Sequence, residues 1–290
     1  MSDGTVSIGN ESLRCVLVDN RSVGAHGQGY NGILSLEGPP GAASPFVPRY
    51  AGLNLEHYFD TRAKPDSDTW FEPRRSAMSV QALGDTVAEL HQPQTAVFGV
   101  ESRTRVAVAS ATSLDISFRM RRLVGPAEPG FLGVFWASYM HQPEDKSIYF
   151  LRAGSTLSAP RWVQLCTQVH GHASSVAHAD DTDEPAWAEP EAMLYANPSP
   201  VRYAVPFFYG RWQDRVLIYM FKPGPTVRFA HSPSGGGSTE DGQDTCPAWD
   251  FQLLIGRCAT GVEYGLDLRL VYKPWRGRTD VLAEVASFMG

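Results

Sequence analysis

The stretch Ser113–Arg122 has the sequence Ser-Leu-Asp-Ile-Ser-Phe-Arg-Met-Arg-Arg, in which apolar and polar side chains alternate. The apolar set is Leu114, Ile116, Phe118 and Met120, and the polar set is Asp115, Ser117, Arg119 and Arg121. A period of two is typical of a β-strand with one buried and one solvated face. The stretch therefore predicts a strand of an antiparallel sheet, and we expect residues 98–110 to form its neighbour.

The same signal recurs along the chain, and helical patterns are nearly absent. The 290 residues include 7 Trp, 11 Tyr, 14 Phe, 27 Gly and 21 Pro, so aromatic strands alternate with turns. Residues 161–172 give the longest alternating strand, 249–257 and 262–273 are predicted to form a late hairpin, and only 279–289 looks helical. We therefore predict an all-β protein, a large antiparallel β-sandwich with a short C-terminal helix.

The domain organisation predicted from these patterns is simple. No repeat and no linker composition divides the chain, so 1–290 is expected to be a single β-sandwich domain. Residues 173–200 are acidic and rich in Ala and Pro, which predicts a long surface excursion. Residues 232–245 are rich in Gly and Ser, which predicts a flexible loop.

Charge and motifs exclude several classes of function. The net charge of −6 without a basic run argues against a nucleic-acid partner. The sequence has no window of 18 apolar residues that would predict a membrane span, and no signal peptide is visible. The four scattered cysteines are expected to be free thiols. These observations together predict a cytoplasmic location. Phosphate-binding glycine loops, serine elbows and zinc-helix motifs are missing from the sequence.

The first candidate site is the stretch 49–60, which packs acids, amides and rings beside Arg49. Period-two alternation places on one face Asn54, Glu56, Tyr58 and Asp60. Glu56 with Asp60 could act as a general base or accept hydrogen bonds from sugar hydroxyls. The structural alternative is that both carboxylates lie at a solvated strand edge and form ion pairs with arginines. His57 falls on the opposite, apolar face, which favours a core histidine unless the strand bulges.

The second candidate site is His170-Gly171-His172, at the end of the predicted strand 161–172. The i, i+2 spacing would place both imidazoles on one face, where they could transfer protons or bind a divalent metal. The same face would carry Trp162, Gln164 and Gln168. Rings together with amides suit a sugar, because a sugar offers C–H faces and hydroxyl groups.

Two further strands carry polar pairs. Tyr139 and His141 share a face at a strand end, so His141 is a general-acid candidate, with an ordinary turn histidine equally expected. Asp250 and Gln252 lie two apart, which suits recognition of hydroxyl groups, and a structural role for Asp250 in the preceding turn is the alternative.

The order of these features resembles the galactose-mutarotase-like (aldose 1-epimerase-like) supersandwich of carbohydrate-active proteins. The resemblance rests on the early segment 30–36, Tyr-Asn-Gly-Ile-Leu-Ser-Leu, on Asn54-Leu55-Glu56-His57, on histidines in central strands and on a late strand with Asp250. It implies a glutamate base and a histidine acid that act on the anomeric hydroxyl and the ring oxygen of a sugar. The acid would be His141, His170 or His172. Glu263 is nearest by position to the late glutamate of the family, and Glu56 is the better match to a cleft.

Three hypotheses follow from the sequence. The first is a carbohydrate-active enzyme, an epimerase or isomerase, a hydrolase or a lyase, that uses carboxylate and histidine side chains on a small-molecule sugar without a cofactor. The second is a non-catalytic carbohydrate-binding protein. The third is a metal-dependent β-barrel enzyme centred on His170 and His172.

Overall fold

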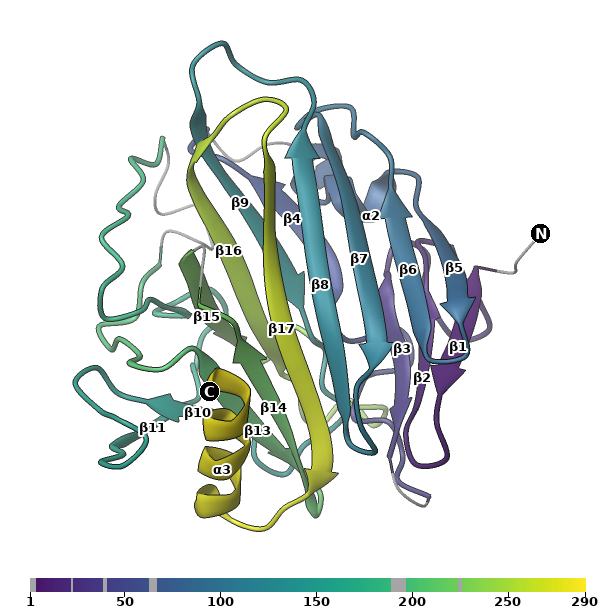
Figure 1. Cartoon of the computed structure of the whole chain (residues 1–290), viewed down its shortest axis with the longest axis vertical. Coiled ribbons are helices and arrows are strands. Elements are labelled where there is room, and N and C mark those ends of the chain that lie inside the picture. Colours follow the sequence, from purple (N-terminus) through teal and green to yellow (C-terminus); the bar gives the residue numbers. More distant parts are fainter. Residues whose placement is uncertain (1–3, 22, 39–40, 63–66, 189–196, 224–225) are drawn as a thin grey trace.

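The computed structural model describes residues 4–21, 23–38, 41–62, 67–188, 197–223 and 226–290. Its largest element is a nine-stranded antiparallel sheet with the strand order β11-β10-β13-β14-β17-β8-β7-β6-β5 (Figure 1). The bounds, in chain order, are β5 Ser79–Gly84, β6 Val87–Gln92, β7 Val100–Val108, β8 Ser113–Arg122, β10 Ile148–Leu151, β11 Trp162–Leu165, β13 Phe207–Trp212, β14 Arg215–Phe221 and β17 Glu263–Pro274.

A five-stranded sheet with the order β12-β15-β16-β9-β4 faces the large sheet, and a three-stranded sheet, β1-β2-β3, lies at one end. The bounds of the five strands are β4 Asn54–Phe59, β9 Gly130–Ala137, β12 Ser175–Val176, β15 Thr226–Ser232 and β16 Ala248–Cys258. The small sheet consists of β1 Thr5–Gly9, β2 Arg14–Val18 and β3 Gly32–Glu37. The helices are α1 Ser67–Trp70, α2 Glu72–Arg75 and α3 Arg278–Met289.

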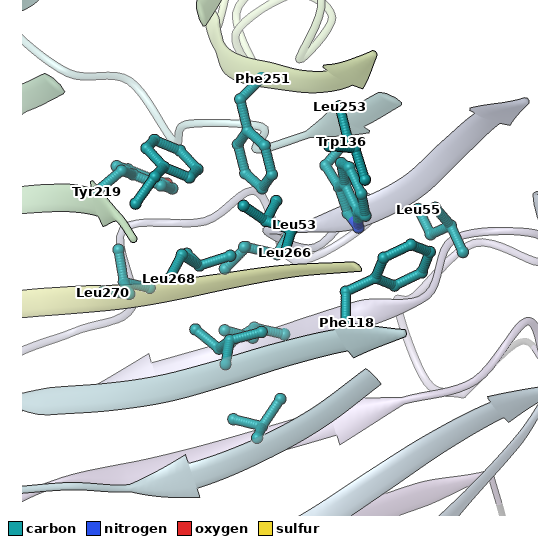
Figure 2. Close-up of a cluster of buried hydrophobic side chains, with 14 of the residues drawn as sticks. Leu53, Leu55, Phe118, Trp136, Tyr219, Phe251, Leu253, Leu266, Leu268 and Leu270 are labelled. Atoms are coloured by element: carbon teal, nitrogen blue, oxygen red, sulfur yellow. The ribbon is translucent and has the colours of Figure 1, made fainter. Parts of the chain in front are cut away.

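The main core fills the space between the two large sheets (Figure 2). Phe118 of β8 meets Trp136 of β9 edge to face at 4.8 Å, and Phe221 of β14 meets Phe251 of β16 at 4.9 Å between ring centroids. Each fully buried side chain of this size contributes about 1.5–3 kcal/mol of hydrophobic stabilisation. The alternation in Ser113–Arg122 is therefore confirmed as a strand whose apolar face joins this core.

Both sheets are also covered on their outer faces. Helix α3 packs Val281, Val285 and Phe288 against the nine-stranded sheet. A second apolar cluster, with Phe59, Phe135 and other residues, lies on the outer face of the five-stranded sheet. The predicted all-β sandwich with a C-terminal helix is confirmed.

The predicted late hairpin is wrong. Strand β16 pairs with β15 and β9, whereas β17 pairs with β14 and β8, so the connection between them crosses from one sheet to the facing sheet. Two alternating strands joined by a short turn suit both arrangements, and the partners available in each sheet decide between them.

The two predicted loops make specific contacts. Within 173–200, of which 189–196 lies outside the described residues, β12 pairs with β15, and the Trp187 ring stacks on Phe59 at 6.0 Å. Residues Ser174–Ala177 are buried, so this part of the excursion is not at the surface. In 232–245, Lys146 forms an ion pair of 2.6 Å with Asp244.

A matched pair of glycines in β9 gives a stability prediction. A Cβ on Gly133 would lie 2.1 Å from the Phe59 ring, whereas a Cβ on Gly130 would meet no atom within 4 Å. We expect Gly133→Ala to lower the free energy of unfolding by about 1–3 kcal/mol through overpacking, and Gly130→Ala to change it far less. Urea unfolding of both variants measures the difference, and equal destabilisation would contradict the packing described here.

Candidate functional site

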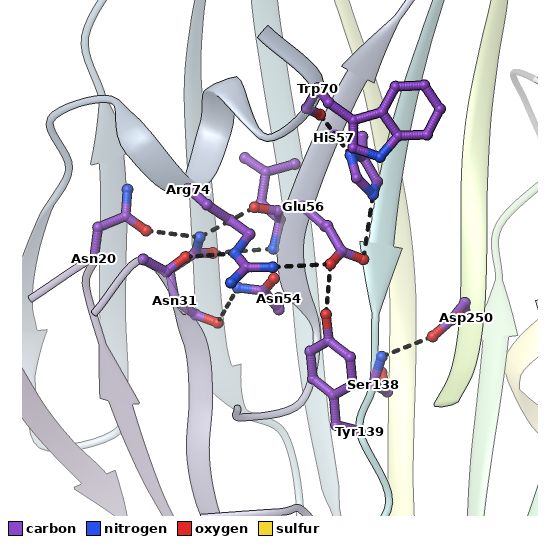
Figure 3. A network of polar contacts seen from close by, with 12 residues as sticks. Asn20, Asn31, Asn54, Glu56, His57, Trp70, Arg74, Ser138, Tyr139 and Asp250 are labelled. Atoms are coloured by element: carbon purple, nitrogen blue, oxygen red, sulfur yellow. Dashed lines mark hydrogen bonds and ion pairs between the residues drawn. The ribbon is translucent and has the colours of Figure 1, made fainter. Parts of the chain in front are cut away.

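An open cavity of about 630 Å³ lies on the outer face of the five-stranded sheet. Its walls come from strands β4, β9 and β16, from helices α1 and α2, and from the turns after β11 and β15. The lining residues are Tyr30, Glu56, His57, Trp70, Phe71, Arg74, Phe135, Ala137, Tyr139, His170, Gly171, Asn197, Ser232, Ser234, Gly235, Ala248 and Asp250. Figure 3 shows the polar network on one side of this cavity.

A bulge in β4 determines which side chains of this strand enter the cavity. Opposite β9, Leu55 pairs with Trp136 and His57 pairs with Phe135, so Glu56 is an extra residue in β4. An extra residue inverts the alternation that follows it. Glu56 and His57 therefore both line the cavity, and His57, buried and hydrogen-bonded, takes the orientation that the alternation allowed only if the strand bulged.

The same bulge corrects the position of Tyr58. Instead of sharing a face with Glu56, Tyr58 enters the main core, where its hydroxyl donates to Gln92 Oε1 at 3.0 Å and contacts Ser102 Oγ at 3.1 Å.

The Asn31 side chain holds the backbone of β4 beside the bulge (Figure 3). Leu55 N–H donates to Asn31 Oδ1 at 3.0 Å, and Asn31 Nδ2 donates to Leu55 O at 3.1 Å. Asn31 Nδ2 also donates to Asn20 Oδ1, and Asn20 Nδ2 donates to the carbonyls of Pro73 and Ser76 at 2.8 Å. This amide relay links the Glu56 strand to helix α2, which carries Arg74.

Glu56 is the centre of the polar network. Arg74 Nη1 lies 3.1 Å from Glu56 Oε1, and the Tyr139 hydroxyl donates to the same oxygen at 2.5 Å. Burial, and then the charge of Glu56, raise the pKa of Tyr139 well above its usual value, so this phenol remains a hydrogen-bond donor. Glu56 Oε1 therefore accepts hydrogen bonds from both a guanidinium and a phenol.

His57 is held in its neutral form beside this carboxylate. Burial lowers the pKa of His57, and the charge of Glu56 opposes that effect only in part. Nδ1 lies 2.5 Å from Trp70 O, which accepts a hydrogen bond from it, and Nε2 lies 3.5 Å from Glu56 Oε2. The imidazole also packs against Phe71 at 4.6 Å between ring centroids.

Asp250 of β16 is the second carboxyl group of the cavity. Burial, and then the charge of Glu56, raise its pKa well above the usual value, and the Ser138 N–H that donates to Oδ1 at 3.0 Å opposes this only in part. The cavity therefore contains one carboxyl group that favours the neutral form and another that is paired with an arginine.

His170 reaches the cavity from a turn. Only the first part of the predicted strand 161–172 forms a strand, and the prediction for the rest is wrong. Strand β11 ends at Leu165, and positive φ angles of 77° at Gly171 and 49° at Ala173 are incompatible with an extended chain. His170 Nδ1 lies 2.7 Å from Ser232 Oγ at the end of β15.

His172 does not join His170 in the cavity; it is exposed and is not among the lining residues. Within the described part of the chain, no group of three or more His, Cys, Asp or Glu side chains could hold a metal ion.

The other predicted residues of strand 161–172 also lie away from the cavity. Trp162 packs on the far side of the nine-stranded sheet, with its ring 5.5 Å from Tyr209 and 5.1 Å from the Arg278 guanidinium. Gln164 donates to Ser147 Oγ, and Gln168 donates to Cys166 O, both from exposed positions. Trp162 and Gln164 share a face of β11, but this face does not extend to Gln168 and does not line the cavity.

Of the remaining candidates from the sequence, some line the cavity and others lie outside it. Tyr139 and Asp250 line the cavity. Asp60 pairs with Arg62 outside it, and Arg49 is exposed beside the Tyr50 ring. His141 is not a lining residue, and its carbonyl accepts a hydrogen bond from Trp212 Nε1.

Two predicted amides are buried next to the site without lining it. Asn54 Nδ2 donates to Asn31 O, and Gln252 Nε2 donates to Ser175 Oγ. Glu263 is the residue nearest by position to the late glutamate of the family. It is exposed in β17 and pairs with Arg121.

Sequence reasoning missed Arg74 and the rings that surround it. The Arg74 guanidinium lies 3.6 Å from the centroid of Tyr30 and 4.8 Å from that of Phe71. The only local signal was the aromatic pair Trp70-Phe71, which ends three positions before the arginine.

Comparison of the whole fold with solved structures gives consistent results. A protein of Escherichia coli K12 named "Putative aldose 1-epimerase" is similar over 93% of this chain and 99% of its own, with a TM-score of 0.52 and 12% identity. A galactose mutarotase-like protein from Lactobacillus casei ATCC 334 is similar over 93% and 100%, with a TM-score of 0.50 and 12% identity. The chain has the galactose-mutarotase-like fold. The resemblance predicted from the sequence is confirmed at the level of structure.

Comparisons of sequence show no such relationship. No protein-family model matches the chain, and no curated protein matches it. Among the described residues of this galactose-mutarotase-like chain, no helix combines the length and the apolar character needed to cross a membrane.

Proposed function

We propose that this protein is a carbohydrate-active enzyme that acts on a sugar ring by acid–base catalysis in the Glu56 cavity. The observation that carries the proposal is that Glu56 and Asp250 line one cavity in opposite environments. Arg74 and Tyr139 both contact the Glu56 carboxylate, whereas burial raises the pKa of Asp250. A pair of carboxyl groups in such different surroundings supplies the acid and the base of many sugar-processing sites.

The shape and lining of the cavity suit a sugar. Its volume of about 630 Å³ lies within the usual range for small-molecule sites. Trp70, Phe71 and Phe135 offer flat apolar surfaces to sugar C–H groups. Asn197 and Ser234 add an amide and a hydroxyl group that can bind sugar hydroxyls.

The arrangement suits interconversion of the anomers of an aldose. Glu56 Oε2 takes the proton of the anomeric hydroxyl, and Asp250 gives its proton to the ring oxygen as the bond between that oxygen and the anomeric carbon breaks. After rotation of the open-chain aldehyde, closure of the ring reverses both transfers. Glu56 loses its added proton and Asp250 regains one, so the enzyme ends each turnover in its starting state.

The names of the two similar structures agree with this reaction class, since one is named for aldose 1-epimerase and the other for galactose mutarotase. The sequence placed a histidine in the role of the acid. His170 is the only one of its three candidate histidines among the described lining residues, and its contact with Ser232 fixes the ring at the rim of the cavity. In our proposal His170 binds a sugar hydroxyl there.

The test is the rate of anomeric interconversion of common aldoses, measured by polarimetry and by NMR exchange spectroscopy with purified protein. We expect acceleration over buffer for at least one aldose, a loss of about 10²–10⁴ in kcat for Asp250→Asn, and a smaller loss for His170→Gln. A larger loss for His170→Gln than for Asp250→Asn would make His170 the acid. Sugar binding without acceleration for any aldose would instead indicate a carbohydrate-binding protein.

A further inference from the structure

A second groove of about 930 Å³ adjoins the Glu56 cavity on the side of helix α2. It is lined by Asn20, Arg21, Gln28, Gly29, Tyr30, Phe71, Arg74, Arg75, Ser76, Ala77 and Met78. Neither the acid–base mechanism nor any motif of the sequence accounts for this groove.

Three residues, Tyr30, Phe71 and Arg74, line both the groove and the cavity. Arg74 forms the partition between them, because its Nη1 contacts Glu56 Oε1 and its Nε donates to Gly29 O at 3.0 Å. The cavity and the groove therefore share these three side chains as a common wall.

The walls of the groove are held in place without a ligand. Gly29 N–H donates to Asn20 O at 2.9 Å, and Asn20 Nδ2 ties the same segment to the carbonyls of Pro73 and Ser76. Gly29 has a φ of 86°, and a Cβ there would lie 3.2 Å from Arg74 O, so the loop can approach helix α2 this closely only at a glycine. A preformed groove binds its ligand with a smaller entropic cost.

The floor of the groove can bind hydroxyl groups. The side chains of Gln28 and Ser76 make no hydrogen bond to any residue that the structure describes, and Gln28 is exposed. Met78 and the ring of Phe71 supply apolar surface between these polar groups. This alternation of amide, hydroxyl and apolar surface is the same chemistry that suits a sugar in the Glu56 cavity.

The two spaces together exceed the needs of one sugar ring, which is smaller than the ligands that usually fill a site of 300–1,000 Å³. Building on the proposed function, we propose that the groove is a second sugar subsite, so that the substrate is a disaccharide or longer glycan. One unit occupies the cavity at Glu56 and the next lies across Arg74 against Gln28 and Ser76.

Calorimetric titration of monosaccharides, and of disaccharides built from each of them, tests this proposal. We expect at least one disaccharide to bind the wild-type protein tenfold or more tightly than its component monosaccharides. Ala77→Trp should fill the groove and remove this surplus while leaving monosaccharide affinity unchanged, because Ala77 is exposed and lines only the groove. Gln28→Ala should remove part of the surplus without adding bulk.

Ala109→Trp, on an exposed residue that lines neither space, is the matched control for the added indole. Monosaccharide binding without a disaccharide surplus would overturn the second subsite and leave the proposed function standing, as would a surplus that survives both Ala77→Trp and Gln28→Ala. If neither monosaccharides nor disaccharides bind, the proposed function fails, and the second subsite fails with it.

Discussion

Replacing Glu56 by glutamine is expected to lower kcat by about 10²–10⁴ while sugar binding is largely retained. The amide is nearly isosteric with the carboxylate and can still accept hydrogen bonds from Tyr139 and Arg74. It cannot take a proton from the anomeric hydroxyl. Kinetics of anomeric interconversion, combined with calorimetric titration of the same sugar, separate the two effects.

The matched control is Glu89→Gln, which removes a carboxylate from an ion pair of 2.9 Å with Arg103 on the nine-stranded sheet. Because that pair is exposed, we expect unchanged kinetics and a change in stability below about 1 kcal/mol. Tyr139→Phe is a second variant that leaves the Glu56–Arg74 pair intact and removes one hydrogen bond to the base. It should shift the pH–rate profile, and full activity of both Glu56→Gln and Tyr139→Phe would exclude Glu56 as the base.

Asp250 is expected to make the stability of the protein depend on pH in a direction unusual for an aspartate. Its folded-state pKa is raised, so the stabilising contribution is complete below the unfolded-state value of about 4 and is lost as pH rises toward the folded-state pKa. Within that window the unfolded chain releases a proton that the folded protein keeps. Each pH unit then costs the wild-type protein about 1.4 kcal/mol through this group.

Asp250→Asn removes this titration and keeps an oxygen that can accept from Ser138 N–H. We therefore expect the free energy of unfolding of the variant, relative to wild type, to increase between about pH 4 and neutral pH. Urea unfolding across that range measures the difference. Asp267→Asn, in a half-exposed pair with Arg119, is the control. A constant or falling difference for Asp250→Asn would show that Asp250 ionises readily in the folded protein.

Long regular strands could be predicted from the sequence, because alternation is a local property. The stretch Ser113–Arg122 forms β8 with the predicted apolar face, and the helix predicted at 279–289 is α3, Arg278–Met289. The segment 161–172 alternates equally well, yet its strand ends at Leu165. Alternation reports which residues can form a strand, whereas the presence of a neighbouring strand decides how far the strand extends.

Only some of the residues of the site could be predicted from the sequence, because contacts between distant segments leave no local pattern. Glu56, Tyr139, Asp250 and His170 were candidates in the sequence, and the structure brings all four to one cavity. Arg74 was missed because it lies in a four-residue helix with no pattern that links it to Glu56. Arg74 and Glu56 are linked by the amide relay from Asn31 through Asn20. Asn31 binds the strand of Glu56 and Asn20 binds the helix of Arg74, and both elements lie much farther along the chain.

By itself, then, the sequence determined the strands, their apolar faces and hence the all-β sandwich, since burial of one face follows from a period of two. Only the tertiary structure decided which sheet each late strand joins and which side chains of β4 face the cavity. The β4 bulge adds one unpaired residue opposite β9, and this inverts the faces of His57 and Tyr58. Such an inversion depends on the partner strand, and no pattern within residues 49–60 contains that information.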